Sequence, residues 1–356
     1  MNKAVYTRDV PPDRFDALQL LLGEAEKDHI KVMVVGGTDS GKTTLLTFLM
    51  NEFIARGLSV TVVDSDVGQK SILPPATISL GVPRGPISSP SELEGVLHYF
   101  IGTTSPGQYA GEMALGVAKL AEIASKTADV TLIDTTGFVS GVGLEMKRLK
   151  VELVRPDFLI LLEREGELEL LARSVGHLTR VIRLSVSDKV REYSREERRE
   201  VRKEKWKRYF ESSSILEVDL RRITPTGTSM FQGRGLSGGE KSLLSEVFGW
   251  IVFAGWKSDR YVVVKADTGD FRLPRRPSLH AIDFEKLSNL LVGFINAEGF
   301  CEGLGILKWL RFSEMKAEVL TPLSEEALEN VVELRFGRIR VLESGDELGL
   351  LRREEL

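Results

Sequence analysis

The sequence has little cysteine, no long apolar run and no strong net charge. Its 356 residues contain one cysteine, Cys301, which excludes an intramolecular disulfide framework and suits a reducing compartment. No stretch approaches about 18 uninterrupted apolar residues, and the first residues lack a signal-peptide core, so we expect a cytoplasmic protein with no membrane contact. The formal net charge of −4 does not favour nucleic-acid binding, so any basic surface must be local.

Apolar runs alternate with helical patterns over much of the chain. This alternation is typical of a parallel sheet covered by helices, in which ligands bind beyond the carboxyl ends of the strands. We expect strands at 31–35, 58–64, 96–101, 130–134 and 158–162, and helices at 12–29, from Lys42 onward, at 109–125 and at 144–154.

A glycine-rich segment between the first strand and the next helix carries the clearest chemical signal. It reads Gly36-Gly37-Thr38-Asp39-Ser40-Gly41-Lys42-Thr43-Thr44, which fits the phosphate-binding P-loop. The backbone N–H groups would face the phosphates of ATP, Lys42 would bridge the β- and γ-phosphates, and Thr43 would ligate Mg²⁺ or another divalent cation.

Carboxylates and hydroxyls follow three further strands. Asp64 and Asp66 stand at alternate positions, so one can act as a general base while the other helps with the metal; the alternative is an Asx turn that closes the strand. Asp134 ends an apolar run as a Walker B aspartate does, with a turn cap as the alternative. Thr103 and Thr104 offer hydroxyls that can grip a phosphate, although a plain turn explains them equally well.

A segment from Arg191 to Phe210 sorts its charges on a helical wheel. Nine basic and five acidic residues lie between Arg191 and Arg208, and the arginines cluster in one arc. Like-charged neighbours such as Arg198 and Arg202 repel each other unless an anion lies between them. The pattern predicts a mobile lid that closes over ATP and a nucleic-acid phosphate, with a solvated helix as the simpler alternative.

These motifs predict an α/β protein with a P-loop NTPase fold. A mostly parallel sheet flanked by helices would be followed by a smaller β-rich C-terminal domain. The expected divisions are an N-terminal helical segment (1–29), a kinase domain (30–230) with its lid helix at about 190–210, a loop-rich junction (231–258) and the β-rich domain (259–356), whose strands we expect at 261–265, 290–295, 305–310, 331–336 and 339–342.

The sequence resembles the polynucleotide 5′-hydroxyl kinases related to subunits of the messenger-RNA cleavage and tRNA-splicing complexes, in their archaeal form. The matching segments are 36–44, 63–69, 103–107, 133–139, 198–202 with Tyr209-Phe210, 289–293 and 303–307. The resemblance implies transfer of the γ-phosphate of ATP to the 5′-hydroxyl of RNA, and of DNA as well. It implies that Asp66 activates the hydroxyl, that Gln69 and Thr104 hold acceptor and phosphate, and that Arg198 and Arg202 act from the lid. The sequence departs from the family at Tyr193, which stands where a further lid arginine is expected. The resemblance also implies that Asp134 is a metal ligand together with Thr43 and Asp66.

Three other classes compete with this interpretation. Asp134-Thr135-Thr136-Gly137 also fits a GTPase switch or assembly factor, but Ser187-Asp188-Lys189 is a poor substitute for the tetrad that reads guanine. Leu236-Ser237-Gly238-Gly239-Glu240 resembles the signature loop of transport ATPases, yet no Walker B strand follows it, so we expect a junction loop. A small-molecule kinase is the nearest enzymatic rival, against which the charge-sorted helix argues.

Overall fold

The computed structural model describes residues 10–267 and 278–356 and divides the chain into two compact units. One unit ends at Lys205 and the other begins at Trp206, so the division falls inside helix α6 (Arg195–Phe210). This is earlier than the boundary expected near residue 230. The reason is that β8 (Ser214–Asp219) pairs with β16 (Lys316–Thr321) of the C-terminal sheet, and β9 (Thr224–Thr226) pairs with β17 (Val331–Val341) of the same sheet.

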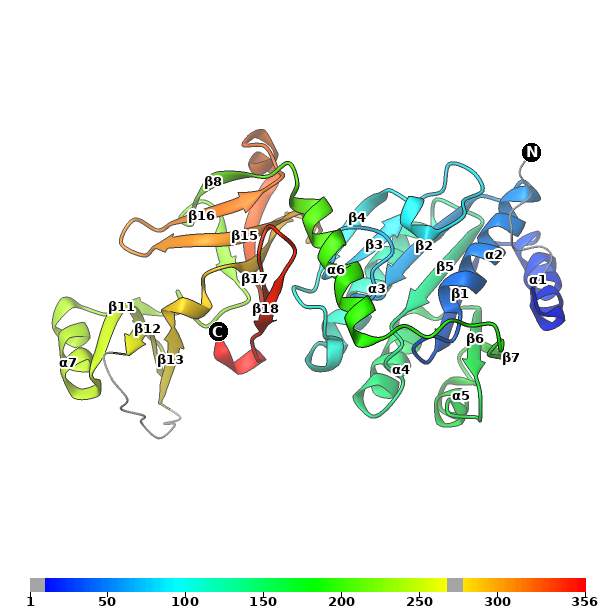
Figure 1. The fold of residues 1–356 in the computed structure, drawn as a ribbon, viewed down its shortest axis with the longest axis horizontal. Coiled ribbons are helices and arrows are strands. Elements are labelled where there is room, and N and C mark those ends of the chain that lie inside the picture. The colour runs from blue at the N-terminus through cyan, green and yellow to red at the C-terminus, as the bar shows by residue number, and fades with distance from the viewer. Residues whose placement is uncertain (1–9, 268–277) are drawn as a thin grey trace. The chain divides into compact units, whose positions relative to one another are not determined.

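The N-terminal unit is built around one sheet in the order β4-β3-β2-β5-β1-β6-β7 (Figure 1). Its parallel strands are β1 (Ile30–Gly36), β2 (Val60–Ser65), β5 (Val130–Thr135), β6 (Phe158–Glu163) and β7 (Arg180–Ser185). The mostly parallel sheet expected from the sequence is therefore confirmed. The expected run at 96–101 is β4 (Gly95–Phe100), which joins the edge through antiparallel pairing with β3 (Thr77–Gly81).

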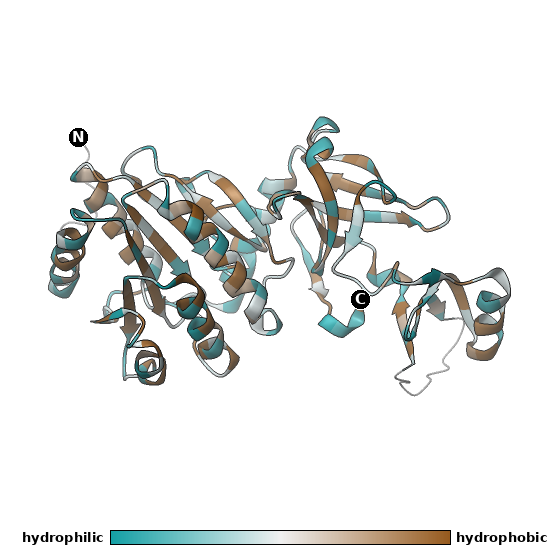
Figure 2. Ribbon diagram, turned by 180° about the vertical axis from the view of Figure 1, so that it is seen from behind, coloured by the Kyte–Doolittle hydropathy of each residue, from teal (hydrophilic) through white to brown (hydrophobic). Residues whose placement is uncertain are grey.

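Helices cover this sheet because its central strands are apolar on both faces. Val32 and Val34 of β1 belong to the same apolar cluster as residues of α1 (Pro12–Ala25) and α2 (Lys42–Ala55). Met33 and Val35 are fully buried too, and alternation along the strand turns them to the opposite face. The helices α3 (Ala110–Ser125), α4 (Val142–Val154) and α5 (Glu169–Val175) pack against one another in that order. Figure 2 shows the apolar strands inside and the polar outer faces of the helices.

The register of the parallel strands brings the motifs to one edge of the sheet. Asp64 at the end of β2 lies opposite Asp134 at the end of β5, and Ser65 lies opposite Thr135. On the other side of β5 runs β1, whose carboxyl end leads into the P-loop. The order of the strands therefore brings the predicted site residues of three separate segments to one edge of the sheet.

The C-terminal unit is rich in β-structure, as expected, and contains two sheets that share one apolar core. One sheet has the order β18-β17-β14-β15-β16-β8, with β9 beside β17; its further strands are β14 (Leu290–Asn296), β15 (Cys301–Arg311) and β18 (Glu347–Leu350). The other has the order β10-β11-β12-β13, formed by β10 (Arg234–Gly235), β11 (Trp250–Lys257), β12 (Tyr261–Asp267) and β13 (Leu279–Asp283).

Two expectations for this unit were wrong. The strands expected at 331–336 and 339–342 form the single strand β17, because Gly337 and Arg338 fall at a register shift against β14 and do not end the strand. The junction expected at 231–258 holds β10, β11 and helix α7 (Gly238–Phe248). Ser237 and Glu240 form a capping box at the start of α7, so the supposed signature loop is a helix N-terminus.

Among the residues that the structure describes, no helix has the length and apolar character needed to cross a lipid bilayer.

Candidate functional site

The P-loop has the strand and helix expected on either side of it. β1 ends at Gly36, α2 begins at Lys42, and Gly41 adopts a left-handed conformation with φ of 85°. A Cβ atom at Gly36 would lie 2.5 Å from the Ser40 Oγ and 2.8 Å from the Leu162 carbonyl oxygen, so the first glycine is required by close packing. The Lys42 Nζ donates to the Gly37 carbonyl oxygen at 2.7 Å across the loop.

A cavity of about 760 Å³ opens over this loop. It is lined by many of the residues predicted from the sequence, namely Thr38, Asp39, Ser40, Gly41, Lys42, Thr43, Thr44, Asp66, Gln69, Arg198 and Arg202. Five predicted residues do not line it: Gly36, Gly37, Thr103, Thr104 and Asp134. The buried Ser40 hydroxyl lines the cavity and has no hydrogen-bond partner among the described residues, so an acceptor from a ligand would satisfy it.

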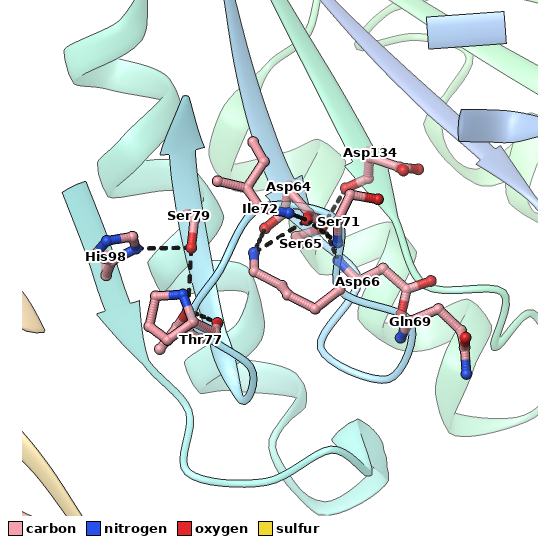
Figure 3. Close-up of polar contacts among 12 residues, drawn as sticks. Asp64, Ser65, Asp66, Gln69, Ser71, Ile72, Thr77, Ser79, His98 and Asp134 are labelled. Carbon is pink, nitrogen blue, oxygen red and sulfur yellow. Dashed lines mark hydrogen bonds and ion pairs between the residues drawn. The ribbon is translucent and has the colours of Figure 1, made fainter. Parts of the chain in front are cut away.

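The two aspartates after β2 have separate tasks (Figure 3). Asp64 is buried, and its Oδ2 accepts hydrogen bonds from the backbone N–H groups of Ser71 at 2.7 Å and Ile72 at 2.8 Å. The same carboxylate forms an ion pair with the buried Lys70 at 3.3 Å. It therefore organises the loop and cannot reach a substrate. Asp66 reaches the cavity, although its Oδ1 accepts the N–H groups of Gly68 at 3.0 Å and Gln69 at 2.9 Å, which is the Asx turn considered as the alternative. Its Oδ2 accepts no hydrogen bond from a described residue.

Asp134 lies where a Walker B aspartate is expected. Its Oδ2 accepts a hydrogen bond from the Thr43 hydroxyl at 3.1 Å, and its Oδ1 accepts the N–H of Thr135 at 2.8 Å. Burial raises the pKa of Asp134 to about 7, with the neighbouring Asp64 carboxylate adding to the rise and Lys42 opposing it. A cation beside Thr43 would favour the ionised form of this carboxyl group.

The loop after β4 uses its first hydroxyl locally. The Thr103 Oγ1 accepts the N–H of Ser105 at 3.1 Å, and the side chain is buried, as the plain-turn alternative predicts. Thr104 does not line the cavity either, and Pro106 of the same loop does. The loop thus borders the cavity through Pro106 and not through the two predicted hydroxyls.

The lid helix is linked to the P-loop through Asp39. The Asp39 Oδ2 accepts a hydrogen bond from the Tyr193 backbone N–H at 3.1 Å and forms an ion pair with the Arg198 guanidinium group. Arg202, one turn further along α6, lines the cavity. Three of the sorted cations therefore border the cavity, because Arg191 lines it too, although Arg191 also pairs with Glu197 in the first turn of α6 at 2.6 Å.

Sequence reasoning missed one part of the cavity. It is bordered by Val10, Pro11 and Arg14 around the start of α1, by Leu45 and Phe48 of α2, and by Ser187, Lys189 and Val190 after β7. The helical pattern of α1 gave no sign that it borders a ligand site. The segment Ser187-Asp188-Lys189 is a poor guanine-reading motif, but its place after a strand of the parallel sheet was a usable signal of a ligand site.

Three buried lysines were also missed: Lys70, Lys147 and Lys150. Lysines at 147 and 150 in an amphipathic pattern predict a solvent-facing side of a helix, so periodicity could not have found them.

Comparisons with known proteins agree with this geometry. The family model described as the P-loop of the mRNA cleavage and polyadenylation factor CLP1 matches residues 36–212. A polyribonucleotide 5′-hydroxyl-kinase of Thermococcus kodakarensis is 55% identical over 356 residues, which is 100% of both chains. One of Pyrococcus horikoshii is 51% identical, over 100% of this chain and 97% of its own. The Clp1 kinase of Danio rerio is 32% identical, over 54% of this chain and 47% of its own.

Among solved structures, a Clp1p–Pcf11p complex matches with a TM-score of 0.60 and 12% identity, covering 92% of this chain and 78% of the other. At that identity the likeness concerns the fold alone.

Proposed function

The chain belongs to the polyribonucleotide 5′-hydroxyl-kinases, and from this membership we propose that it transfers the γ-phosphoryl group of ATP to the 5′-hydroxyl end of RNA. The observation that carries the proposal is the single cavity that brings together the P-loop, Asp66 and the arginines of α6. A nucleotide-driven switch needs no base aimed at an acceptor and no second group of cations, so it explains this arrangement less well.

ATP would lie with its phosphates in the P-loop and its base at the far end of the cavity. The loop N–H groups, the start of α2 and Lys42 supply positive potential for the phosphates. The unpartnered Ser40 hydroxyl adds a donor. Phe48 and Val190 offer apolar contact to the base, and Arg14 closes that end of the cavity.

The donor set near Thr43 fits Mg²⁺. The Thr43 hydroxyl and the nearer oxygen of the Asp134 carboxylate are 3.1 Å apart, so both ligands are oxygens. Mg²⁺ prefers oxygen ligands and binds through one or two carboxylates together with phosphates. When bound, it would neutralise charge on the β- and γ-phosphates.

The transfer would proceed in line. Asp66 would accept the proton of the 5′-hydroxyl as its oxygen bonds to the γ-phosphorus, and the bond from that phosphorus to the β,γ-bridging oxygen would break to release ADP. Lys42, Arg198 and Arg202 would stabilise the negative charge that develops on the transferring group. Gln69 and the loop carrying Thr103 and Thr104 would hold the acceptor end. In the ATP complex, Arg198 would exchange the Asp39 carboxylate for a phosphate oxygen.

Three finer assignments complete the proposal. DNA 5′-ends would be accepted as well, as the resemblance to polynucleotide 5′-hydroxyl kinases implies. The chain acts in the cytoplasm, as its single cysteine suggests. Its product would serve RNA processing, as in tRNA splicing.

The test is phosphate transfer from γ-labelled ATP to a 5′-hydroxyl RNA oligonucleotide and to the matching DNA, with Mg²⁺ present. We expect a 5′-labelled product that Lys42→Ala abolishes, since the β- and γ-phosphates lose their clamp. Hydrolysis of ATP or GTP without label on either oligonucleotide would overturn the proposal in favour of a nucleotide-driven switch.

A further inference from the structure

Two fully buried lysines, Lys147 and Lys150, lie three residues apart on α4, and no step of the transfer described above uses them. Neither lines the cavity. Their spacing places both on one side of the helix. Their neighbour Arg148 is partly exposed and pairs with Glu145 and Glu152 of the same helix, as an ordinary surface cation does.

The two ammonium groups bond to the strand ends that carry the site. The Lys150 Nζ donates to the Ser65 Oγ at 2.9 Å, and the Ser65 Oγ donates in turn to the Asp134 carbonyl oxygen at 2.6 Å. The Lys147 Nζ donates to both the carbonyl oxygen and the Oγ1 of Thr136, at 2.6 and 2.7 Å. One helix face therefore holds the end of β2 and the loop after β5 in a fixed relation.

This arrangement is costly for stability. A buried ammonium group needs a carboxylate partner, as Lys70 has in Asp64 at 3.3 Å, whereas the acceptors of Lys147 and Lys150 are neutral. Burial accordingly lowers the pKa of Lys150 to about 7, although Asp66, Asp134 and Asp64 all oppose the shift. Burial and the neighbouring Lys150 lower the pKa of Lys147 well below its usual value. An apolar side chain of similar length would fill either position at a lower cost.

We propose that Lys147 and Lys150 are positioning residues for phosphoryl transfer, which from α4 fix the two strand ends so that Asp66 and Asp134 converge on the same reacting group. This inference rests on the proposed kinase function. Ser65 stands between Asp64 and Asp66 (Figure 3) and lies opposite Thr135 in the sheet. Its hydroxyl accepts from Lys150 and donates to the Asp134 carbonyl oxygen, so it is the node of the arrangement. If the Ser65 hydroxyl moves, Asp66 moves relative to Asp134. A misplacement of about 1 Å can lower the rate about 100-fold.

The decisive variant is Lys150→Met, which keeps the length of the side chain and removes its charge and its hydrogen bond. We expect kcat for RNA phosphorylation to fall about 10- to 100-fold. We expect the dissociation constant for ATP, measured by equilibrium binding without acceptor, to stay within about twofold, because the P-loop is untouched. The unfolding midpoint should stay equal or rise, because a costly buried charge is gone. Lys147→Met should behave in the same way.

The matched control is Arg148→Met on the same helix. Its exposed ion pairs contribute little, so kcat and ATP binding should equal those of the wild type. A purely structural role for Lys150 would lower the midpoint, kcat and ATP affinity together, and that result would overturn the proposal.

A double-mutant cycle with Ser65→Ala tests the route of the effect. If Lys150 acts through the Ser65 hydroxyl, Ser65→Ala alone should lower kcat to a similar extent, and the double variant should be no slower than the slower single variant. Independent, multiplicative losses would overturn the route through Ser65. Should Lys150→Met not fold, Ser65→Ala still decides, since its wild-type kcat would contradict the positioning role.

The wild-type assay separates the two levels of inference. Absence of transfer to any 5′-hydroxyl end would overturn the proposed function itself. Wild-type transfer that Lys150→Met leaves at full kcat would overturn only the positioning role.

Discussion

At the scale of single residues, Asp64 and Asp66 at the end of β2 share one sequence pattern but differ in their contacts. Alternate spacing puts Asp64 and Asp66 on the same side of an extended chain, and the sequence alone could not assign the base. Burial favours Asp66: Asp64 is bonded to backbone N–H groups and to Lys70, while Asp66 reaches the cavity. The resemblance had named Asp66, and the geometry supplies an independent reason for that choice.

Asp66→Asn should therefore slow the chemical step while leaving ATP binding and stability nearly intact. A positioned general base contributes about 10²- to 10⁴-fold, so we expect kcat to fall by that order with an unchanged dissociation constant for ATP. Asp64→Asn is the matched control: breaking its buried pair with Lys70 should lower the free energy of unfolding by about 3–5 kcal/mol. A loss of ATP affinity in Asp66→Asn would instead assign Asp66 to the metal.

His98 on β4 makes the stability of the N-terminal unit depend on pH. Its Nδ1 bonds to the Ser79 hydroxyl at 2.8 Å, and burial, aided by the nearby Lys70, lowers the pKa of His98 to about 4. Between pH 6.5 and 4, His98 is protonated in the unfolded chain and neutral in the folded chain. Stability should therefore be fully present above pH 6.5 and should fall as the pH drops toward 4, by up to about 3 kcal/mol.

The measurement is the free energy of unfolding in urea at pH 7.5 and at pH 4.5, for the wild type and for His98→Asn. The variant should be less stable at both values but should lose less between them. An identical pH dependence in both proteins would mean that other groups cause the loss.

Short-range motifs were predictable at this scale, and long-range partners were not. The P-loop residues and the Walker B aspartate are fixed by spacing along the chain. The lysine at 150 meets Ser65 only because the fold brings α4 to the end of β2. That contact has no signal in local sequence.

At the scale of elements, the sequence characterised α6 only by the pattern of its charges. The structure adds an anchor: Asp39 of the P-loop holds Arg198 and the N–H of Tyr193, so the helix start is tied to the phosphate site. A carboxylate in an anion-binding loop repels phosphate unless a cation neutralises it. The Asp39 carboxylate therefore offsets the repulsion between the like-charged Arg198 and Arg202, and a bound phosphate can take its place.

Replacing both arginines by alanine should lower the rate and weaken salt-dependent binding of the RNA acceptor. An arginine delivered to a transferring phosphoryl group contributes about 10³- to 10⁵-fold, so kcat should fall by at least the lower value. Each lost phosphate contact should also reduce the slope of log affinity against log salt by about 0.7 for a single strand. Arg195→Ala, which removes an exposed cation of the same helix that does not line the cavity, is the control. If rate and salt slope both stayed at wild-type values, α6 would be an ordinary solvated helix.

Element prediction worked where periodicity was strong and failed where local sequence was ambiguous. Four of the five parallel strands, β1, β2, β5 and β6, were found nearly to their ends, and β7 was not predicted. The strand β3 escaped because Thr77 and Ser79 alternate with apolar residues in a run too short to stand out. Helix α7 was mistaken for a loop because its glycines outweighed the Ser237 and Glu240 capping signal, which could have corrected the prediction.

At the scale of the whole molecule, the chain devotes one compact unit to the cavity and its chemistry. Every residue that borders the cavity lies before Lys205, and the full-length identity to archaeal kinases extends through the β-rich unit as well. The fold class followed from the alternation of strands and helices. The division point did not, because β8 and β9 leave the sequence order to pair with strands far along the chain.

Binding of ATP should stabilise the whole protein through this one cavity. A ligand that binds only the folded state at 100 times its dissociation constant adds about 2.7 kcal/mol, which for a chain of this size raises the unfolding midpoint by a few degrees. We expect that rise with ATP and Mg²⁺ in the wild type, a smaller rise when the metal is chelated, and almost none in Lys42→Ala. The Lys42→Ala variant should keep the midpoint of the free wild type, because among the described residues the Lys42 Nζ bonds to the Gly37 carbonyl oxygen alone. A variant that ATP stabilised as strongly as the wild type would show that the nucleotide binds elsewhere, and the assignment of the cavity would have to be abandoned.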